Sequence, residues 1–224
     1  MTDINLSGRS FGPAAGGKPT ALVALLHGLG ADANDLIALA PELARALPRA
    51  LFVSPDAPFP CDMAPFGRQW FSLQDRAPAK ILDGVTMARP ILDNFLDEAL
   101  AVWGIEGQAL ALLGFSQGAM MALYAGLRRS VPPAAIVAFS GALVGEVPPL
   151  APGKRYPTVL LAHGEDDDVV PFASFRYARA TLSAAGVPVE DLARPGLRHG
   201  IDETGLEAAK GMLGRCLGAV AGPG

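Results

Sequence analysis

Short apolar runs alternate with helical patterns along most of the chain, and this alternation is the strongest constraint on its fold. Strands regularly separated by helices predict an α/β fold, in which a mostly parallel sheet is covered by helices on both faces. The predicted strands are Ala21–Leu26, Ala50–Val53, Ala109–Leu113, Ala134–Phe139, Thr158–Ala162 and Val189–Leu192. The predicted helices are Asp35–Ala46, Leu82–Trp103, Gln117–Arg129, Phe172–Ala184 and Glu203–Val220.

The length of 224 residues fits one domain with a sizeable core, so residues 1–224 are expected to form a single domain. Pro90 lies inside the long predicted helix and is expected to kink it or to mark its true start. Residues 1–10 are a candidate for an edge strand or hairpin. The stretch Pro55–Lys80, rich in proline and aromatic residues, is expected to form an ordered loop.

Composition argues against several classes of partner and cofactor. The net charge is −4 and no basic stripe is interleaved with aromatic residues, so nucleic acid is not expected as a partner. No apolar run is long enough for a membrane span and Met1–Asn5 lacks a leader pattern, so neither membrane insertion nor a signal peptide is expected. The two cysteines, Cys61 and Cys216, form no disulfide framework and fit a reducing cytoplasm. No metal motif is present, and no cofactor is expected.

The pentapeptide Gly114-Phe115-Ser116-Gln117-Gly118 stands between an apolar run and a helical pattern. Strand, Gly-x-Ser-x-Gly, helix is the context of a nucleophile elbow, whose tight turn needs small residues two places before and after the serine. The serine then projects above the edge of the sheet, at the positive end of the following helix. The sequence therefore predicts Ser116 as a nucleophile.

Parallel α/β sheets bind ligands at the carboxyl ends of their strands, and a glycine-rich loop follows the first predicted strand. This loop is His27-Gly28-Leu29-Gly30. In an α/β-hydrolase such a loop supplies one N–H of the oxyanion hole, and the residue after the serine supplies the other. The backbone amides of Leu29 and Gln117 are therefore the predicted oxyanion donors.

A serine hydroxyl becomes a good nucleophile when a base takes its proton and an acid orients the base. In hydrolases with a nucleophile elbow the chain order is serine, acid, histidine. His199 follows both Ser116 and a run of acids, whereas His27 precedes the serine and His163 precedes the acids. His199 is therefore the predicted base. The acid lies within residues 165–168, and spacing alone does not choose among these four.

Several blocks together resemble the phospholipase/carboxylesterase family of α/β-hydrolases, which includes the acyl-protein thioesterases. The resemblance runs from about Thr20 to Leu217 and implies an α/β-hydrolase fold. The blocks, in chain order, are Leu26–Asp32, Trp70-Phe71, Gly114–Met120, His163–Pro171 and His199-Gly200.

The resemblance implies roles for individual residues. Ser116 matches the family's nucleophile and His199 its base, and the family acid, four residues before the proline of the Val-Val-Pro block, falls on Asp167. An error of one residue would make Asp166 or Asp168 the acid instead.

Family members bind acyl chains in an apolar groove near the oxyanion loop and the Trp-Phe block. By resemblance, Leu29, Trp70, Phe71 and Val170 are candidate groove residues. For Phe71, an ordinary place in the core is the better explanation. The family also suggests a homodimer.

The substrate range is inferred from a short connection. Residues 140–157 separate two predicted strands and include four prolines. This segment is too short to form a cap domain. An open, shallow site is therefore expected, accepting small-molecule esters with varied short-to-medium acyl groups. We expect a serine carboxylesterase that works through an acyl-enzyme. The alternatives are an acyl-protein thioesterase or lysophospholipase and, more distantly, a non-catalytic ligand-binding protein on the same fold.

Overall fold

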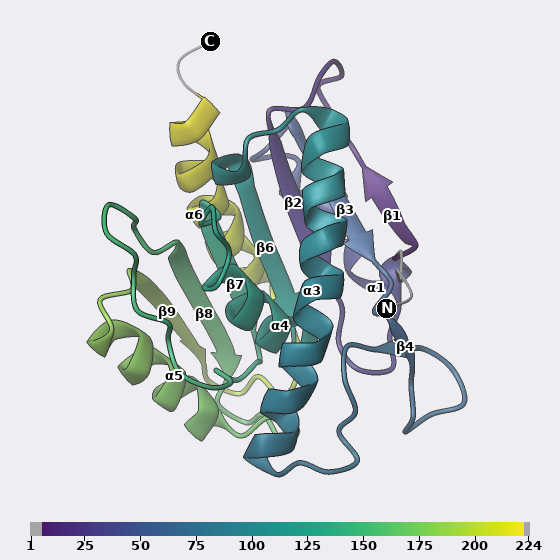
Figure 1. The fold of residues 1–224 in the computed structure, drawn as a ribbon, viewed down its shortest axis with the longest axis vertical. Helices are drawn as coiled ribbons and strands as arrows, with labels where there is room; N and C mark the ends of the chain where they lie inside the picture. The colour runs from purple at the N-terminus through teal and green to yellow at the C-terminus, as the bar shows by residue number, and fades with distance from the viewer. Residues whose placement is uncertain (1–5, 222–224) are drawn as a thin grey trace.

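The computed structural model describes residues 6–221, which form a seven-stranded sheet between two layers of helices (Figure 1). Residues 1–5, for which the sequence predicted no leader, lie outside the described part of the chain. The strand order is β1-β3-β2-β6-β7-β8-β9, in which β1 is antiparallel to β3 and all other neighbours are parallel. The strands are β1 (Gly8–Phe11), β2 (Ala21–Leu26), β3 (Ala50–Pro55), β6 (Leu110–Phe115), β7 (Ala135–Phe139), β8 (Thr158–Gly164) and β9 (Val189–Arg194).

Helices cover both faces of this sheet, which confirms the α/β prediction. The helices α3 and α4 pack against each other on one face, whereas α6 lies behind the sheet in Figure 1. On that second face, the Lys210 ammonium donates to the Glu42 carboxylate over 2.6 Å and joins α6 to α2. The helices are α1 (Ala33–Ile37), α2 (Ala40–Leu43), α3 (Pro78–Trp103), α4 (Gln117–Gly126), α5 (Phe172–Ala184) and α6 (Glu203–Ala221), with a 3₁₀ turn at Gly107–Ala109.

The central strands are buried along their whole length. Every residue of β2 and of β3 is buried, because helices cover both faces and each side chain packs against one of them. This two-sided burial explains why such strands appear in the sequence as continuous apolar runs rather than as an alternation. No helix within residues 6–221 is both long and apolar enough to cross a bilayer.

The observed helix boundaries differ from the predicted ones in two places. The segment predicted as one helix from Asp35 to Ala46 is divided into α1 and α2, with Pro41 in the first turn of α2. The long helix α3 begins at Pro78 and continues through Pro90. Pro90 therefore does not mark its start.

The stretch Pro55–Lys80 contains a small hairpin that the sequence did not reveal. Its two strands, β4 (Phe59–Pro60) and β5 (Arg68–Gln69), are antiparallel. The backbone N–H of Gly30 donates to the Arg68 carbonyl over 2.9 Å, and the Arg68 N–H donates to the Ala31 carbonyl over 2.8 Å. The hairpin thereby fixes the loop that follows β2.

The connection between β7 and β8 carries no inserted domain. Residues 140–157 form neither helix nor strand, which confirms the expectation that no large cap is inserted here. The carboxyl ends of β6, β8 and β9 therefore lie at an edge that this connection does not cover with a separate domain.

Candidate active site

The turn between β6 and α4 has a backbone that only small neighbours permit. Ser116 has φ 54° and ψ −116°, a region that residues with side chains seldom adopt. A Cβ on Gly114 would lie 2.2 Å from the carbonyl oxygen of Gly118, and a Cβ on Gly118 would lie 1.9 Å from that of Leu26. Close backbone approach therefore requires both glycines. The turn places Ser116 directly before the first residue of α4.

A chain of side-chain hydrogen bonds joins the three predicted catalytic residues. The His199 Nε2 atom lies 2.9 Å from Ser116 Oγ, and His199 Nδ1 lies 2.7 Å from Asp167 Oδ2. Ser116 follows β6, Asp167 follows β8 and His199 follows β9. The structure thus brings together, at the carboxyl edge of the sheet, residues that are far apart in the sequence. The Phe115 ring packs on the imidazole of His199 with a centroid separation of 4.8 Å.

The charge of Asp167 determines how the protons of His199 are arranged. Burial raises the pKa of the Asp167 carboxyl, but hydrogen bonds from His199 and from the N–H groups of Val170 and Val169 outweigh it, so the pKa is lower than usual. The ionised carboxylate can only accept hydrogen bonds, so His199 Nδ1 donates to it. Nε2 of the neutral ring is then left to accept the proton of the Ser116 hydroxyl.

The acidic run 165–168 contributes one residue to this chain. Asp167 is buried, whereas Glu165, Asp166 and Asp168 are exposed. Asp168 forms an ion pair with Arg198 at the rim. The structure therefore places Asp167, and neither of its neighbours, against His199.

The loop after β2 lies directly against the elbow. A Cβ on Gly28 would lie 3.4 Å from Ser116 Cβ. The hydrogen bonds formed within residues 6–221 include none donated by the backbone N–H of Leu29 or of Gln117. Two N–H groups without protein acceptors, on the two segments that flank a candidate nucleophile, are what an oxyanion hole requires.

The buried side chain of His27 holds the loop after β2 in place through hydrogen bonds. Its Nε2 accepts a hydrogen bond from the Ala57 N–H over 3.0 Å, so the ring is neutral and carries its proton on Nδ1, which lies 2.7 Å from the Gly28 carbonyl. Burial lowers the pKa of His27, which is consistent with this neutral form. The side chain therefore supports the loop His27–Gly30 and takes no part in the hydrogen-bond chain of Ser116.

The buried side chain of Gln117 ties the elbow to the segment after β5. Its Oε1 accepts from the Trp70 N–H over 2.8 Å, and its Nε2 donates to the Phe71 carbonyl over 2.7 Å. The indole N–H of Trp70 donates in turn to the His27 carbonyl over 3.0 Å. One amide side chain and one indole thus connect the elbow, the segment after the hairpin and the oxyanion loop.

The four residues predicted for an acyl groove lie in different environments. The side chains of Trp70 and Phe71 are 0% exposed, so they offer no accessible surface to a ligand and support the site from the core. Val170 is also buried, and its N–H bonds to Asp167. Leu29 is half-buried and is the one of the four with substantial exposed surface.

His163 also reaches the hydrogen-bond chain, although the sequence did not suggest it. Its Nε2 lies 3.2 Å from Asp167 Oδ2 and 2.9 Å from the Val170 carbonyl. Chain order excluded this histidine as the base, but its position near the end of β8, four residues before Asp167, is the signal that marks it as a neighbour of the acid.

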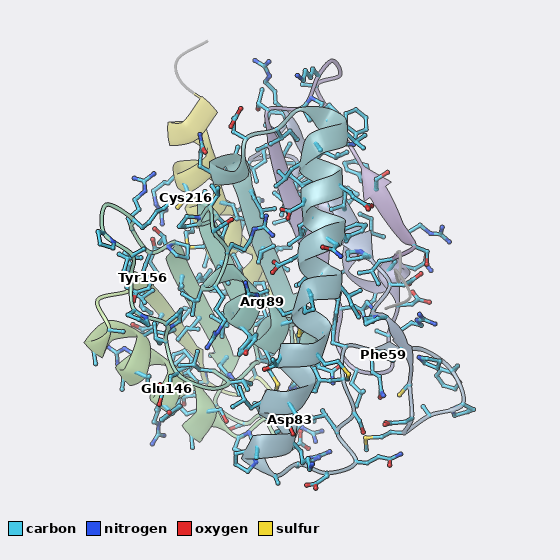
Figure 2. All side chains as sticks on the ribbon, in the orientation of Figure 1. Phe59, Asp83, Arg89, Glu146, Tyr156 and Cys216 are labelled. Carbon is cyan, nitrogen blue, oxygen red and sulfur yellow. The ribbon has the colours of Figure 1, made fainter. Side chains whose placement is uncertain are left out.

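A groove of about 960 Å³ lies at the opposite edge of the sheet. Its lining includes Ala134 and Thr158, at the amino ends of β7 and β8, together with Tyr156 and Cys216, which Figure 2 labels. The groove is therefore remote from Ser116 and forms no part of the candidate site. Within residues 6–221, no group of three or more His, Cys, Asp or Glu side chains is arranged to hold a metal ion.

Comparison with known proteins identifies the family of this chain. The profile of the phospholipase/carboxylesterase family matches residues 13–217. The chain belongs to the phospholipase/carboxylesterase family. Esterase YpfH of Escherichia coli (strain K12) is 31% identical over 194 residues, which cover 84% of this chain and 79% of that protein. Acyl-protein thioesterase 1 of Neurospora crassa is 25% identical over 225 residues, covering 91% of this chain and 90% of that protein.

A solved structure extends the comparison to the whole fold. The crystal structure of esterase PE8 superimposes with a TM-score of 0.86 at 40% identity, covering 96% of this chain and 100% of that one. Membership in the phospholipase/carboxylesterase family confirms the resemblance found in the sequence. It also confirms the prediction of an enzyme, because the relatives are named as esterases and thioesterases: the protein is a hydrolase of the carboxylesterase/thioesterase type.

Proposed function

We propose that the protein is a serine carboxylesterase that hydrolyses esters of short-to-medium acyl groups through Ser116, His199 and Asp167. The observation that carries this proposal is the unbroken hydrogen-bond chain from Ser116 Oγ through the His199 ring to Asp167 Oδ2. It leaves Nε2 as acceptor and Oγ as donor, which is the arrangement needed to make a serine nucleophilic.

In the first half of the reaction, Ser116 Oγ attacks the ester carbonyl while His199 Nε2 takes its proton. The imidazolium that forms is stabilised by the Asp167 carboxylate, which holds Nδ1–H and stays ionised. The negative oxygen of the tetrahedral intermediate accepts hydrogen bonds from the Leu29 and Gln117 N–H groups, each worth about 3 kcal/mol of barrier. His199 then protonates the leaving alcohol, and the acyl group remains on Oγ.

In the second half, His199 acts as a base again. It removes a proton from a water that attacks the acyl-enzyme, and the same two N–H groups hold the second oxyanion. Protonation of Ser116 Oγ by His199 then releases the carboxylic acid and restores the resting state. Apart from the substrate and this water, the steps use only groups of the chain itself.

The proposed acyl range rests on the uncapped edge of the sheet. Residues 140–157 add no helix over the carboxyl ends of the strands. We infer from this an open site, in which a long acyl chain would find few enclosed contacts. A rate measured with p-nitrophenyl esters from acetate to palmitate should be highest between acetate and octanoate. A steep rise toward palmitate would contradict this range.

A thioesterase activity has its own support, since acyl-protein thioesterase 1 of Neurospora crassa matches along nearly the whole chain. The chemistry at the acyl carbonyl is the same for an ester and a thioester, and only the leaving group differs. Values of kcat/KM on ester and thioester pairs with the same acyl group decide between the two. The carboxylesterase proposal expects the ester to be the better substrate at every length.

The role of Ser116 is tested by Ser116→Ala. We expect hydrolysis of p-nitrophenyl butyrate to fall by at least about 10⁴-fold, because the nucleophile is lost while oxyanion and binding contacts remain. The matched control is Ser183→Ala, which changes an exposed serine of α5. A fluorophosphonate probe should label the wild-type protein once, at Ser116. Absence of labelling, with a normal fold, would favour a non-catalytic binding protein.

A further inference from the structure

The carboxylate of Asp167 has four hydrogen-bond donors around it, and two of them are histidines. Oδ1 accepts from the N–H groups of Val169 over 2.9 Å and Val170 over 2.8 Å. Oδ2 faces His199 Nδ1 at 2.7 Å and His163 Nε2 at 3.2 Å. The two rings approach the same oxygen, although one of them does not touch Ser116.

The partners of His163 determine where its proton lies. Nε2 faces two acceptors, the Val170 carbonyl at 2.9 Å and the Asp167 carboxylate, so this nitrogen must carry the hydrogen. Burial lowers the pKa of His163, although its bonds to Val170 and Asp167 oppose that effect, and the ring is therefore neutral near pH 7. His163 is a fixed N–H donor that brings no charge to the site.

Packing holds the His163 ring in this orientation. Its side chain is 2% exposed, and the rings of Phe172 and Phe175 lie edge-on at centroid distances of 6.0 Å. The titratable and charged groups around it are few: Asp167 and His199 face it, Arg176 lies outside Phe172, and the Asp168–Arg198 pair lies at the rim. A buried donor held by two aromatic rings has little freedom to turn away from its acceptors.

We propose that His163 is a positioning residue for hydrolysis: its Nε2–H holds the Asp167 carboxylate in place and takes part of the negative charge of Oδ2. This proposal rests on the proposed function of the same site. A carboxylate held from two sides keeps Oδ2 aligned with His199 Nδ1, so the base stays directed at Ser116. A second donor that takes part of the charge of Oδ2 also weakens the electrostatic stabilisation that Asp167 gives to the imidazolium of His199.

Two substitutions separate this role from mere packing. In His163→Gln, the amide N–H of glutamine reaches about as far as Nε2 and keeps a donor, whereas His163→Leu fills similar space without one. We expect His163→Leu to lower kcat by roughly 10-fold with little change in KM, because a hydrogen bond to a charged group is among the stronger ones. His163→Gln should stay within about 3-fold of the wild type.

The pH profile is the second readout. In His163→Leu, Oδ2 carries more negative charge and stabilises the imidazolium of His199 more strongly. The acid limb of kcat/KM should therefore move to higher pH by about half a unit or more, whereas His163→Gln should keep the wild-type limb. Equal losses in both variants with an unmoved limb would show that His163 only packs, and would overturn the proposal.

A third measurement does not depend on esterase activity. Histidine-selective ¹⁵N NMR follows the titration of the His199 ring directly, in the wild type and in both variants. The titration midpoint should rise in His163→Leu and stay in His163→Gln. The same midpoint in all three would overturn the proposal even for an active enzyme. If Ser116→Ala instead showed that the protein is no serine esterase, a raised midpoint in His163→Leu would still establish the contact with Asp167.

Discussion

The two halves of the candidate active site are held by different forces. The nucleophile half, around Ser116, is fixed by backbone atoms in close contact, with no room for a Cβ at Gly114 or Gly118. The acid–base half, at the ends of β8 and β9, is fixed by polar side-chain contacts: Asp167 is hydrogen-bonded to His199, and His163 Nε2 lies 3.2 Å from the same carboxylate oxygen. Steric contacts therefore hold the nucleophile half, and electrostatic interactions hold the acid–base half.

This difference predicts how each half responds to change. Contacts between backbone atoms cannot relax one at a time, so a small volume change at the elbow affects the stability of the whole fold. Hydrogen bonds to a carboxylate can be lost singly, so changes in the loops affect activity and pH dependence first. The experiments below test this contrast, beginning with the largest expected effect.

Asp167→Asn should have the largest effect and leave the fold intact. The amide keeps the shape of the carboxylate but favours the wrong tautomer of His199, so kcat on p-nitrophenyl butyrate should fall by about 10⁴-fold. Asp166→Asn changes an exposed neighbour in the same acidic run and should keep kcat within about 2-fold. If Asp166→Asn were the inactive variant, the assignment of the acid would be wrong.

Gly118→Ala should damage the fold itself. The new methyl group would lie 1.9 Å from the Leu26 carbonyl oxygen, a backbone atom that cannot move alone. We expect urea unfolding to show a loss of about 3 kcal/mol or more. Gly214→Ala is the matched control within α6, where nothing lies within 4 Å of the added Cβ, and it should gain about 0.5–1 kcal/mol. Equal stabilities of the two variants would contradict the steric account of the elbow.

Gln117→Leu should have an intermediate effect on stability. It keeps the backbone N–H of residue 117 but leaves the Trp70 N–H and the Phe71 carbonyl without their partners in a buried place. The expected loss is about 2–3 kcal/mol in the free energy of unfolding. Gln108→Leu, on an exposed glutamine, should change it by less than about 0.5 kcal/mol. A fully stable Gln117→Leu would show that the segment after β5 is held by other contacts.

The pH dependence of stability should be the smallest effect. Burial lowers the pKa of both His27 and His163 in the folded state. Below about pH 6.5 the unfolded chain therefore binds more protons at these two residues than the folded chain does. Stability is therefore complete above that pH and falls as pH decreases. Urea unfolding should therefore give a lower free energy of unfolding at pH 5.5 than at pH 7.0, with both histidines contributing in the same direction. His163→Gln should remove its share, and an unchanged difference would contradict its neutral burial.

The fold and part of the site followed from the sequence because they depend on local patterns. Buried parallel strands need continuous apolar runs, and the structure confirms the strands predicted from them, with ends shifted by at most two residues. The glycines around Ser116 predicted a tight turn, and the order of serine, acid and histidine along the chain predicted His199 as the base. The catalytic roles of Ser116 and His199 stay predictions, but the sequence alone predicts that the two residues lie close together.

The remaining features depend on contacts between distant segments. Spacing along residues 165–168 does not indicate which acid turns inward, because that depends on His199 and on the backbone N–H groups of Val169 and Val170. The choice of Asp167 came from the resemblance to the family. The hairpin β4–β5 has two residues in each strand, too few for a periodic signal. The indole N–H of Trp70 donates to the His27 carbonyl, a contact between distant segments that no local pattern encodes.

The irregular connection between β7 and β8 gives this fold room for evolutionary change. Gly141, its second residue, lies beside the elbow, where an added Cβ would be 3.3 Å from the Ser116 carbonyl oxygen. The rest of the connection contributes no strand or helix. Doubling the length of such a segment costs only about 0.6 kcal/mol in loop entropy. New residues inserted here would border the reaction centre without disturbing the sheet, so a lineage could acquire a lid and a new substrate preference by lengthening one loop.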